Sequence, residues 1–538
     1  MRKVYLACFS FLLGSAIQAQ SFTMVKDINP GLSNGNPNHL INIGGTLFFS
    51  ANNGASGTEL WKSNGTALGT VLVKDINPGA ASSSPNNFFV MGGILYFRAS
   101  NGASGVELWR SDGTAAGTFM LKDINAGAAS SSPLHLSELA GTLIFSAEDA
   151  VNGREVWKSD GTAAGTVLLK NISPGVSDGN PSWFTQLGNK LYFAAQIATT
   201  GYELWATDGT AGGTALIKDI YPGATGSEPV GLITVNNILY FRAFAPVEGW
   251  TMIKSDGTGP GTIVLKPAGG ISMPEWLTNI GGVLYFTSTQ DELWKTNGTA
   301  AGTVMIKDMV PGPGGGFIQK MTYSNGLAFF EGTNGVNGYE LWKSNGTAAG
   351  TVMVKDIIPG AGSSNIDNLG HISNMLYFSA SNGVNGEELW KSDGTAAGTV
   401  LVQDFAVPGD GTPRDFTMVG NKFFLTANDE SAGRELWVAR LHITFGLEKT
   451  LADVRLSTLL IYPNPASEAA TLMLTADRQE KLTYIIYDIQ GKPLQQKSIV
   501  VTEGSNRINL ETSTLAAGSY TVVVKGATTS QSIQFIKQ

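Results

Sequence analysis

The chain has 538 residues, of which 14% are charged and 67 are glycine. This composition is typical of many short strands joined by tight turns rather than of a helical enzyme. The formal net charge is −8, and the sequence has no cluster of basic residues. Nucleic acid is therefore excluded as a partner, because its phosphates require dense lysine and arginine.

Residues 1–19 have the features of a cleavable export signal. Arg2 and Lys3 precede an apolar run that ends at Ile17, and small or polar residues follow it. The only cysteine, Cys8, lies within that run, so the exported chain is expected to contain no disulfide. No later apolar stretch reaches the roughly 20 residues that span a bilayer as a helix. We therefore expect no transmembrane segment once the signal is removed.

Residues 20–440 contain a repeat with a period near 48 residues. One marker residue identifies each copy, with steps of 48, 48, 48, 48, 41, 48, 48 and 47 residues. In the copy from Lys74 to Lys122, turn residues separate four short runs rich in β-branched and aromatic residues. Four antiparallel strands per copy predict one blade of a β-propeller. The marker residues are Trp61, Trp109, Trp157, Trp205, Ile253, Trp294, Trp342, Trp390 and Trp437.

The repeated residues have structural interpretations. One large aromatic residue per blade is expected to pack one sheet against its neighbour. A glutamate lies two residues before most of the tryptophans, and a lysine follows it fifteen residues later, as in Glu107 and Lys122. Folding the hairpin between them predicts an ion pair across adjacent strands. The Asp-Gly or Asn-Gly dipeptide between the third and fourth strands is a hairpin signal.

The two ends of the repeat complement each other. Glu435 is the last glutamate of the series and has no lysine fifteen residues downstream. Residues 22–28 form an isolated strand whose Lys26 has no preceding glutamate. Pairing of Lys26 with Glu435 predicts an all-β ring of about nine blades that the N-terminal strand closes. An open or divided ring is the alternative, since propellers typically have four to eight blades.

One position varies while the repeat around it stays constant. It lies 22 residues before each marker, except in the short sixth copy, where Trp276 is taken as the equivalent. This is near the start of the first strand, where the loops between blades are expected to form the mouth of the propeller channel. Aromatic, histidine and carboxylate side chains suit a carbohydrate or peptide site. The alternative is that these are solvated loop residues under weak constraint. The candidate ligand-binding residues are His39, His135, Trp183, Trp276 and Asp415.

The fifth and sixth copies depart from the pattern. The fifth has Thr251-Met252-Ile253 in place of Glu-Leu-Trp. The sixth lacks the glycine-containing loop before its third strand, so that only Asp291 separates Gln290 from Glu292. Loss of this loop predicts a notch beside Trp276, where a ligand is expected first.

The composition changes after the repeat. Residues 441–457 form an expected linker, and residues 458–538 form an expected second domain. This domain begins with Tyr462-Pro463-Asn464-Pro465 and continues with alternating strands separated by turns such as Ala517-Gly518. The pattern predicts a small β-sandwich of about eighty residues.

Two sets of motifs resemble known families. The repeated Glu-Leu-Trp-x-x-Asp-Gly-Thr, over about residues 22–440, resembles the ELWxxDGT repeat family of exported bacterial proteins, and this resemblance implies no settled activity. The tail is similar to type A sorting domains of the type IX secretion system. That similarity implies a bacterium of the Bacteroidetes kind, contact of residues 458–538 with the secretion machinery, and passage through the periplasm to release or anchoring at the cell surface. The tail motifs are Tyr462-Pro463-Asn464-Pro465, Tyr487-Asp488-Ile489-Gln490-Gly491 and Leu515-Ala516-Ala517-Gly518-Ser519-Tyr520.

Few residues suggest catalytic or cofactor chemistry. None of the four histidines has the spacing of a zinc site. A Gly-x-Ser-x-Gly match at Gly31–Gly35 falls in a loop between blades rather than in a strand-to-helix turn. No calcium-loop motif is present, so no cofactor or metal is predicted, although calcium in the Asp- and Asn-rich loops is left open.

These observations favour a secreted or surface-displayed binding or adhesion propeller without catalytic activity, whose ligand is a carbohydrate or a protein. One alternative is a polysaccharide-active enzyme, a glycosidase or lyase, with carboxylates such as Asp415 and Asp367 converging on the channel mouth. Another is an architectural surface protein that has no ligand.

Overall fold

The computed structural model describes residues 21–441 and 456–538, apart from 176, 267–270, 289–291, 313, 477–478, 503 and 527–529. The expected export signal and most of the expected linker lie outside the described residues. The described chain divides into two compact units, residues 21–441 and residues 456–538. Its regular elements are all strands.

The first unit consists of four-stranded antiparallel sheets, nine of them among the described residues. Four consecutive strands form each of the first four sheets. These are β2 (Asn38–Ile43), β3 (Thr46–Asn52), β4 (Thr58–Ser63) and β5 (Val71–Lys74); β6 (Asn86–Met91), β7 (Ile94–Ser100), β8 (Val106–Ser111) and β9 (Phe119–Lys122); β10 (Leu134–Leu139), β11 (Thr142–Asp149), β12 (Gly153–Ser159) and β13 (Val167–Lys170); and β14 (Ser182–Leu187), β15 (Lys190–Ile197), β16 (Gly201–Thr207) and β17 (Ala215–Lys218).

The next four sheets repeat this order, and the ninth borrows a strand from the start of the chain. They are β18 (Val230–Val235), β19 (Ile238–Ala245), β20 (Gly249–Ser255) and β21 (Ile263–Val264); β22 (Glu275–Ile280), β23 (Val283–Ser288), β24 (Glu292–Thr296) and β25 (Val304–Lys307); β26 (Gln319–Ser324), β27 (Leu327–Gly332), β28 (Glu340–Ser344) and β29 (Val352–Lys355); β30 (Asp367–Ile372), β31 (Met375–Ser381), β32 (Glu387–Ser392) and β33 (Val400–Gln403); and β34 (Arg414–Val419), β35 (Lys422–Asp429), β36 (Gly433–Arg440) and β1 (Thr23–Lys26).

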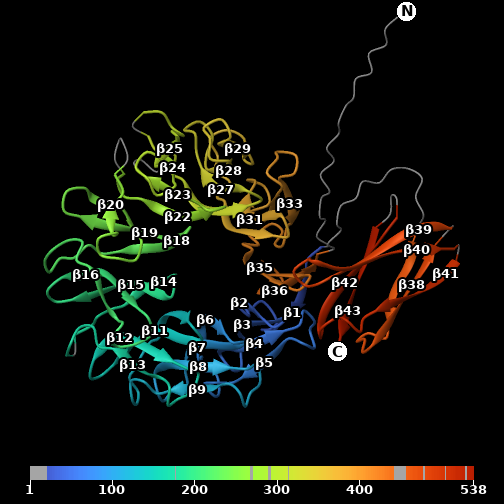
Figure 1. Cartoon of the computed structure of the whole chain (residues 1–538), viewed down its shortest axis with the longest axis horizontal. Helices are drawn as coiled ribbons and strands as arrows, with labels where there is room; N and C mark the ends of the chain where they lie inside the picture. The colour runs from blue at the N-terminus through green and yellow to red at the C-terminus, as the bar shows by residue number, and fades with distance from the viewer. Residues whose placement is uncertain are drawn as a thin grey trace, which may run out of the picture. The chain divides into compact units, whose positions relative to one another are not determined.

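The sheets form a closed ring. The first strand of each sheet contacts the first strand of the next, from β2 through to β34, and β34 contacts β2 again. Figure 1 shows the blades following one another around the ring, with the blue β1 beside the orange β36. The predicted all-β propeller with nine blades is therefore confirmed.

The N-terminal strand closes the ninth blade. β1 pairs antiparallel with β36, so that Thr23 is opposite Val438 and Lys26 is opposite Leu436. The residue before the strand, Phe22, is buried. Its backbone N–H donates to Oε1 of Gln403 at 2.8 Å, and Nε2 of Gln403 donates back to its carbonyl at 3.3 Å. The predicted closure by the N-terminal strand is therefore confirmed.

The hydrophobic core lies between the sheets rather than at one centre. Each of nine clusters of buried side chains joins two consecutive blades of the described ring, including one that joins the ninth blade to the first. In that cluster Trp61 packs with Val25 and with Phe424. The repeated tryptophan therefore holds neighbouring sheets together, which is the role expected for an aromatic residue that recurs once per blade.

The predicted ion pairs between the repeated glutamates and lysines are wrong. Glu107 accepts hydrogen bonds from the backbone N–H groups of Ile124 at 2.9 Å and Ser131 at 2.8 Å, and from the Ser131 hydroxyl at 2.5 Å. Glu435 accepts from the backbone of Ile28 at 3.1 Å and Gly35 at 2.8 Å. Each glutamate thus fastens the loop that leads to the next blade, and Glu435 does so across the closure.

The lysines reach the following blade instead. Nζ of Lys122 donates to the carbonyl of Thr166 at 2.7 Å, and Nζ of Lys26 donates to the carbonyl of Thr70 at 3.0 Å. Lys26 also lies over the Trp61 ring, 5.6 Å from its centroid. The lysines therefore tie neighbouring blades together, and the ninth blade to the first.

A one-residue irregularity explains why glutamate and lysine do not meet. The outer pair of strands shifts register between Leu108 and Trp109, which places Lys122 opposite Leu108 rather than opposite Glu107. Successive residues of a strand point to opposite faces of the sheet, so a shift of one residue moves the lysine to the other face. The same shift occurs in β1, where Lys26 is opposite Leu436.

The second unit is a β-sandwich. One sheet contains β37 (Leu456–Tyr462), β38 (Ala469–Ala476) and β41 (Gly504–Glu511) in that order. The other has the order β40 (Pro493–Val501), β39 (Glu480–Tyr487), β42 (Gly518–Lys525) and β43 (Ser530–Lys537). A single cluster of buried side chains, with Leu472 from one sheet and Val522 from the other, forms its core.

Candidate functional site

The variable position of the repeat occupies the same unusual backbone geometry in every described blade. In all nine blades the register between the first two strands shifts around it. The residue itself has a positive φ, between 51° and 67°. An extra residue at such a bulge re-aims its side chain away from the regular pleat. We call these nine residues the inner rim: His39, Asn87, His135, Trp183, Gly231, Trp276, Lys320, Asn368 and Asp415.

A second left-handed residue precedes each inner-rim residue by three positions. These residues are Asn36, Ser84, Ser132, Asn180, Glu228, Met273, Phe317, Asn365 and Thr412. A left-handed conformation costs a residue other than glycine about 1 to 2 kcal/mol, and such strain persists only where the surrounding structure enforces it. The loop before each first strand therefore has the same left-handed backbone position in every described blade.

His39 and Asp415 form one polar sector of the inner rim. They lie on β2 and β34, which are neighbours across the closure. Desolvation lowers the pKa of His39, while the Asp415 carboxylate opposes this shift. Burial raises the pKa of Asp415 against the influence of Arg414, and Thr426 donates to its Oδ2 at 3.2 Å. Two of the predicted site residues are thus brought together.

Lys320 connects a second polar sector. Its Nζ donates to the carbonyl of Ile366 at 2.8 Å and lies 3.4 Å from Glu331 and 3.7 Å from Asp367. Burial raises the pKa of Glu331, while the nearby Lys320 lowers it. A cation therefore lies within ion-pair distance of both carboxylates, which come from two neighbouring blades.

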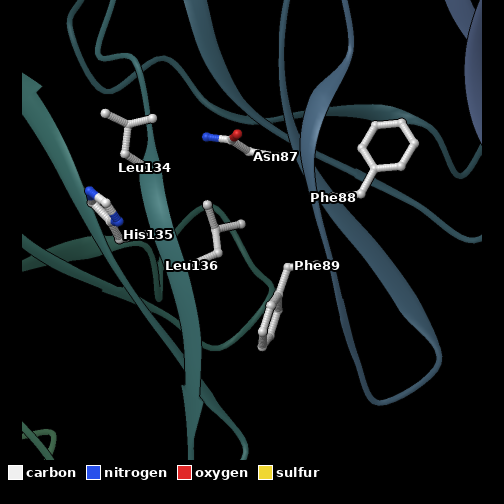
Figure 2. A pocket seen from close by; sticks show the side chains of 6 residues that line it. All are labelled: Asn87, Phe88, Phe89, Leu134, His135 and Leu136. Carbon is white, nitrogen blue, oxygen red and sulfur yellow. The ribbon is translucent and has the colours of Figure 1, made fainter. Parts of the chain in front are cut away.

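A hollow of about 340 Å³ opens between the second and third blades. Figure 2 shows Asn87 and Leu136 directed into the space between β6 and β10, and Phe88 on the far side of β6. His135 also lines the hollow. Desolvation lowers the pKa of His135, and Arg154 lowers it further. A predicted site residue thus lines a concave surface made of apolar and amide side chains.

Trp183 and Trp276 form an aromatic sector. Their side chains are 46% and 44% exposed, in contrast to the buried tryptophans at the marker positions. They lie on β14 and β22, with β18 and its rim residue Gly231 between them. The notch that was predicted beside Trp276 from the missing loop falls on residues 289–291, which lie outside the described residues.

The structure therefore divides the predicted site residues among three sectors rather than gathering them into one pocket. Sequence reasoning missed Glu331, which stands at a position where sister blades carry serine, threonine, arginine or alanine, so comparison between copies could have found it. It also missed the ion pair of Arg242 with Glu275, at 2.5 Å, which joins two neighbouring blades. Assignment of His39, His135, Trp183, Trp276 and Asp415 to ligand binding stays a prediction.

Among the described residues, no group of three or more histidine, cysteine or acidic side chains is arranged to hold a metal ion. No described helix is long and apolar enough to cross a membrane.

The tail matches a known family. Residues 460–538 match the family described as the secretion system C-terminal sorting domain. The chain thus carries a sorting domain at its C-terminal end, which indicates export and a location outside the cell or on its surface. No curated protein matches the sequence of the chain.

Similar solved structures have low scores. A puromycin-hydrolyzing peptidase of Mycobacterium tuberculosis has a TM-score of 0.35 and 11% identity over 68% of this chain and 61% of its own. Sqt1 of Saccharomyces cerevisiae has a TM-score of 0.38 and 12% identity, and the match covers 67% of this chain and 100% of its own. BamB of Moraxella catarrhalis has a TM-score of 0.33 and 10% identity, and the match covers 79% of this chain and 100% of its own. The chain spans about 61% of the length of the puromycin hydrolases that it matches.

Proposed function

We propose that the protein is an exported, non-catalytic binding propeller that the type IX secretion machinery delivers to the cell surface or the medium. The observation that carries this proposal is the inner rim. The same strained backbone position holds six kinds of residue around one ring, whereas the marker and turn positions keep a nearly constant residue type. Side chains that differ on a fixed platform suit recognition of a ligand, either carbohydrate or protein.

The delivery part of the proposal rests on the tail. The matched sorting domain, together with the tail motifs that resemble type A domains, supports contact with the type IX machinery of a Bacteroidetes-like bacterium. The repeat motif, which resembles the ELWxxDGT repeat family of exported proteins, is consistent with this route.

A polysaccharide-active enzyme is the second candidate. It would need two carboxylates on either side of a scissile bond, in a groove that the sugar can enter. Glu331 and Asp367 come from neighbouring blades, but the Lys320 ammonium lies within ion-pair distance of both. The Lys320 ammonium opposes the protonation that a general acid would need at Glu331, so this arrangement favours binding over hydrolysis.

Binding at the inner rim is tested with the full exported chain, residues 20–538, on glycan and peptide arrays. We expect a ligand whose affinity falls about 10-fold or more in His39→Ala or Trp183→Ala, because a few central residues carry most binding energy. The control is Phe119→Ala, which removes an exposed ring from the outer strand of the second blade. Depolymerisation of a bound polysaccharide would instead favour the enzyme, and absence of any ligand would favour an architectural protein.

Deletion of residues 458–538 is expected to leave the propeller in the periplasm. The deleted segment contains the whole matched sorting domain, so the secretion machinery has nothing to recognise. Protease accessibility on intact cells, together with cell fractionation, measures the outcome. Export of full-length Phe119→Ala should be unchanged, and surface delivery of the deleted chain at the wild-type level would contradict the role of the tail.

A further inference from the structure

Three neighbouring first strands present a distinctive arrangement on the inner rim. β14 carries Trp183, β18 carries Gly231 and β22 carries Trp276 at the same position. Both tryptophans are close to half exposed. A rim residue without a side chain therefore lies between two rim residues with large, accessible aromatic surfaces. We call these three residues the tryptophan notch.

The space over Gly231 is open. A Cβ atom placed on this glycine would have no atom within 4 Å, although its φ is +67°. The absence of a side chain is not required by the backbone, because Asn87 and Asn368 adopt φ values of 54° and 51° at the same position of other blades. The glycine thus leaves room that the fold could have filled.

An ion pair lies next in sequence to the tryptophan notch. Nη1 of Arg242 in the fifth blade donates to Oε1 of Glu275, the residue before Trp276, at 2.5 Å. The guanidinium also lies 5.1 Å from the centroid of the Trp250 ring, which packs edge-to-face against Phe244. Stacked and paired in this way, the arginine and the carboxylate are fixed in place as hydrogen-bonding groups beside the aromatic surfaces.

The local charges and the strand edges limit which ligand fits. Arg242 is balanced by Glu275, and Glu228 lies three residues before Gly231, so the sector has no excess positive charge for an anionic polymer. Thr185 donates to the carbonyl of Leu232 at 3.1 Å. Thr234 donates to the carbonyl of Gln186 at 2.7 Å. Hydroxyl groups thus already use backbone acceptors between β14 and β18, which disfavours a peptide added there as a strand.

We propose that the tryptophan notch binds an uncharged polysaccharide, with a sugar ring over Gly231 between the apolar faces of Trp183 and Trp276 and hydroxyl groups bonded to the Arg242–Glu275 pair. This inference rests on the proposed binding function and specifies its ligand class and its place on the ring. Aromatic faces provide apolar contact for the C–H groups of a sugar, and a few fixed polar groups orient its hydroxyls.

The test is calorimetric titration of the full exported chain with cellohexaose, mannohexaose and chitohexaose, and with acidic hexagalacturonate. We expect at least one uncharged hexasaccharide to bind and hexagalacturonate to bind more weakly. Trp183→Ala and Trp276→Ala should each lower the affinity about 10- to 100-fold. Gly231→Asn should abolish binding without lowering the unfolding temperature by more than a few degrees, since asparagine takes this position in two other blades.

The matched control is Ile263→Ala, which truncates a side chain of similar exposure, 46%, on the outer strand of the fifth blade and should leave the affinity unchanged. Saccharide binding that survives all three notch substitutions would overturn the notch while leaving the proposed function intact. Binding to the peptide array described above but to no uncharged saccharide, with loss in Trp183→Ala, would overturn the ligand class alone. Failure of every glycan and peptide to bind would overturn both the notch and the proposed function.

Discussion

Replacement of Phe22 by alanine is expected to destabilise the ring by about 3 to 5 kcal/mol, the usual cost of truncating a buried phenylalanine. The Phe22 ring is 3% exposed and packs edge-to-face against Phe405 at 5.9 Å and Phe423 at 5.3 Å. It anchors the strand that completes the ninth blade, so its loss should also loosen β1 from β36. Thermal unfolding and amide hydrogen exchange of residues 23–26 measure the two effects.

Phe119→Ala is the matched control for this prediction. Phe119 begins the outer strand of the second blade, which occupies the place that β1 has in the ninth, but its ring is 42% exposed. Its truncation should cost less than about 1 kcal/mol, as is usual for surface substitutions. Equal losses in the two variants would show that closure depends little on the residue before β1.

Glu155→Ala is expected to cost about 3 to 5 kcal/mol at pH 5, because it leaves the buried N–H groups of Ile172 and Ser173 without their acceptor, while Gly179 keeps its bond to the carbonyl of Arg154. The carboxylate accepts from Ile172 at 2.8 Å, Ser173 at 3.0 Å and Gly179 at 3.1 Å, and the residue is fully buried. Denaturant unfolding gives the loss. Glu148→Ala in the same blade is the control, since its half-exposed carboxylate makes only a 3.6 Å ion pair with Arg154.

The effect of Glu155→Ala should also depend on pH. Burial raises the pKa of Glu155 from 4.5 to about 7, against the opposing effect of its three backbone donors. A group whose pKa is higher in the folded state stabilises most below its unfolded pKa and loses that contribution as pH rises through the folded pKa. The difference between wild type and variant should therefore shrink between pH 5 and pH 8. A difference that grows over this range would contradict the raised pKa.

Much of the propeller could be predicted because each blade repeats the same sequence period. The closure followed from Lys26 and Glu435 as unmatched ends of the repeat, although these two residues do not pair. The prediction of an ion pair failed because a register shift of one residue leaves no mark on sequence spacing. A carboxylate with backbone donors as partners was likewise hidden, because any residue except proline supplies such a donor.

The site was less predictable than the fold. The repeat period located the variable position, but not its left-handed geometry, since residues as different as Trp183 and Asp415 adopt it. The pairing of Arg242 with Glu275 joins residues 33 apart in different blades, a spacing that matches neither the period nor a helix or strand repeat. The importance of Gly231 appears only when the open space over it and its exposed neighbours are seen together.

Gln403 marks where the ring is joined. At this position most other blades carry a lysine that reaches the carbonyl of a residue about 44 positions ahead, whereas Gln403 binds the backbone of Phe22. The contact that replaces the lysine contact thus joins the eighth blade to the residue before the first strand. Gain or loss of one interior copy by unequal recombination would preserve this junction and the repeated glutamate and lysine contacts between blades. The number of blades, and with it the number of inner-rim residues, can therefore change during evolution by one blade at a time.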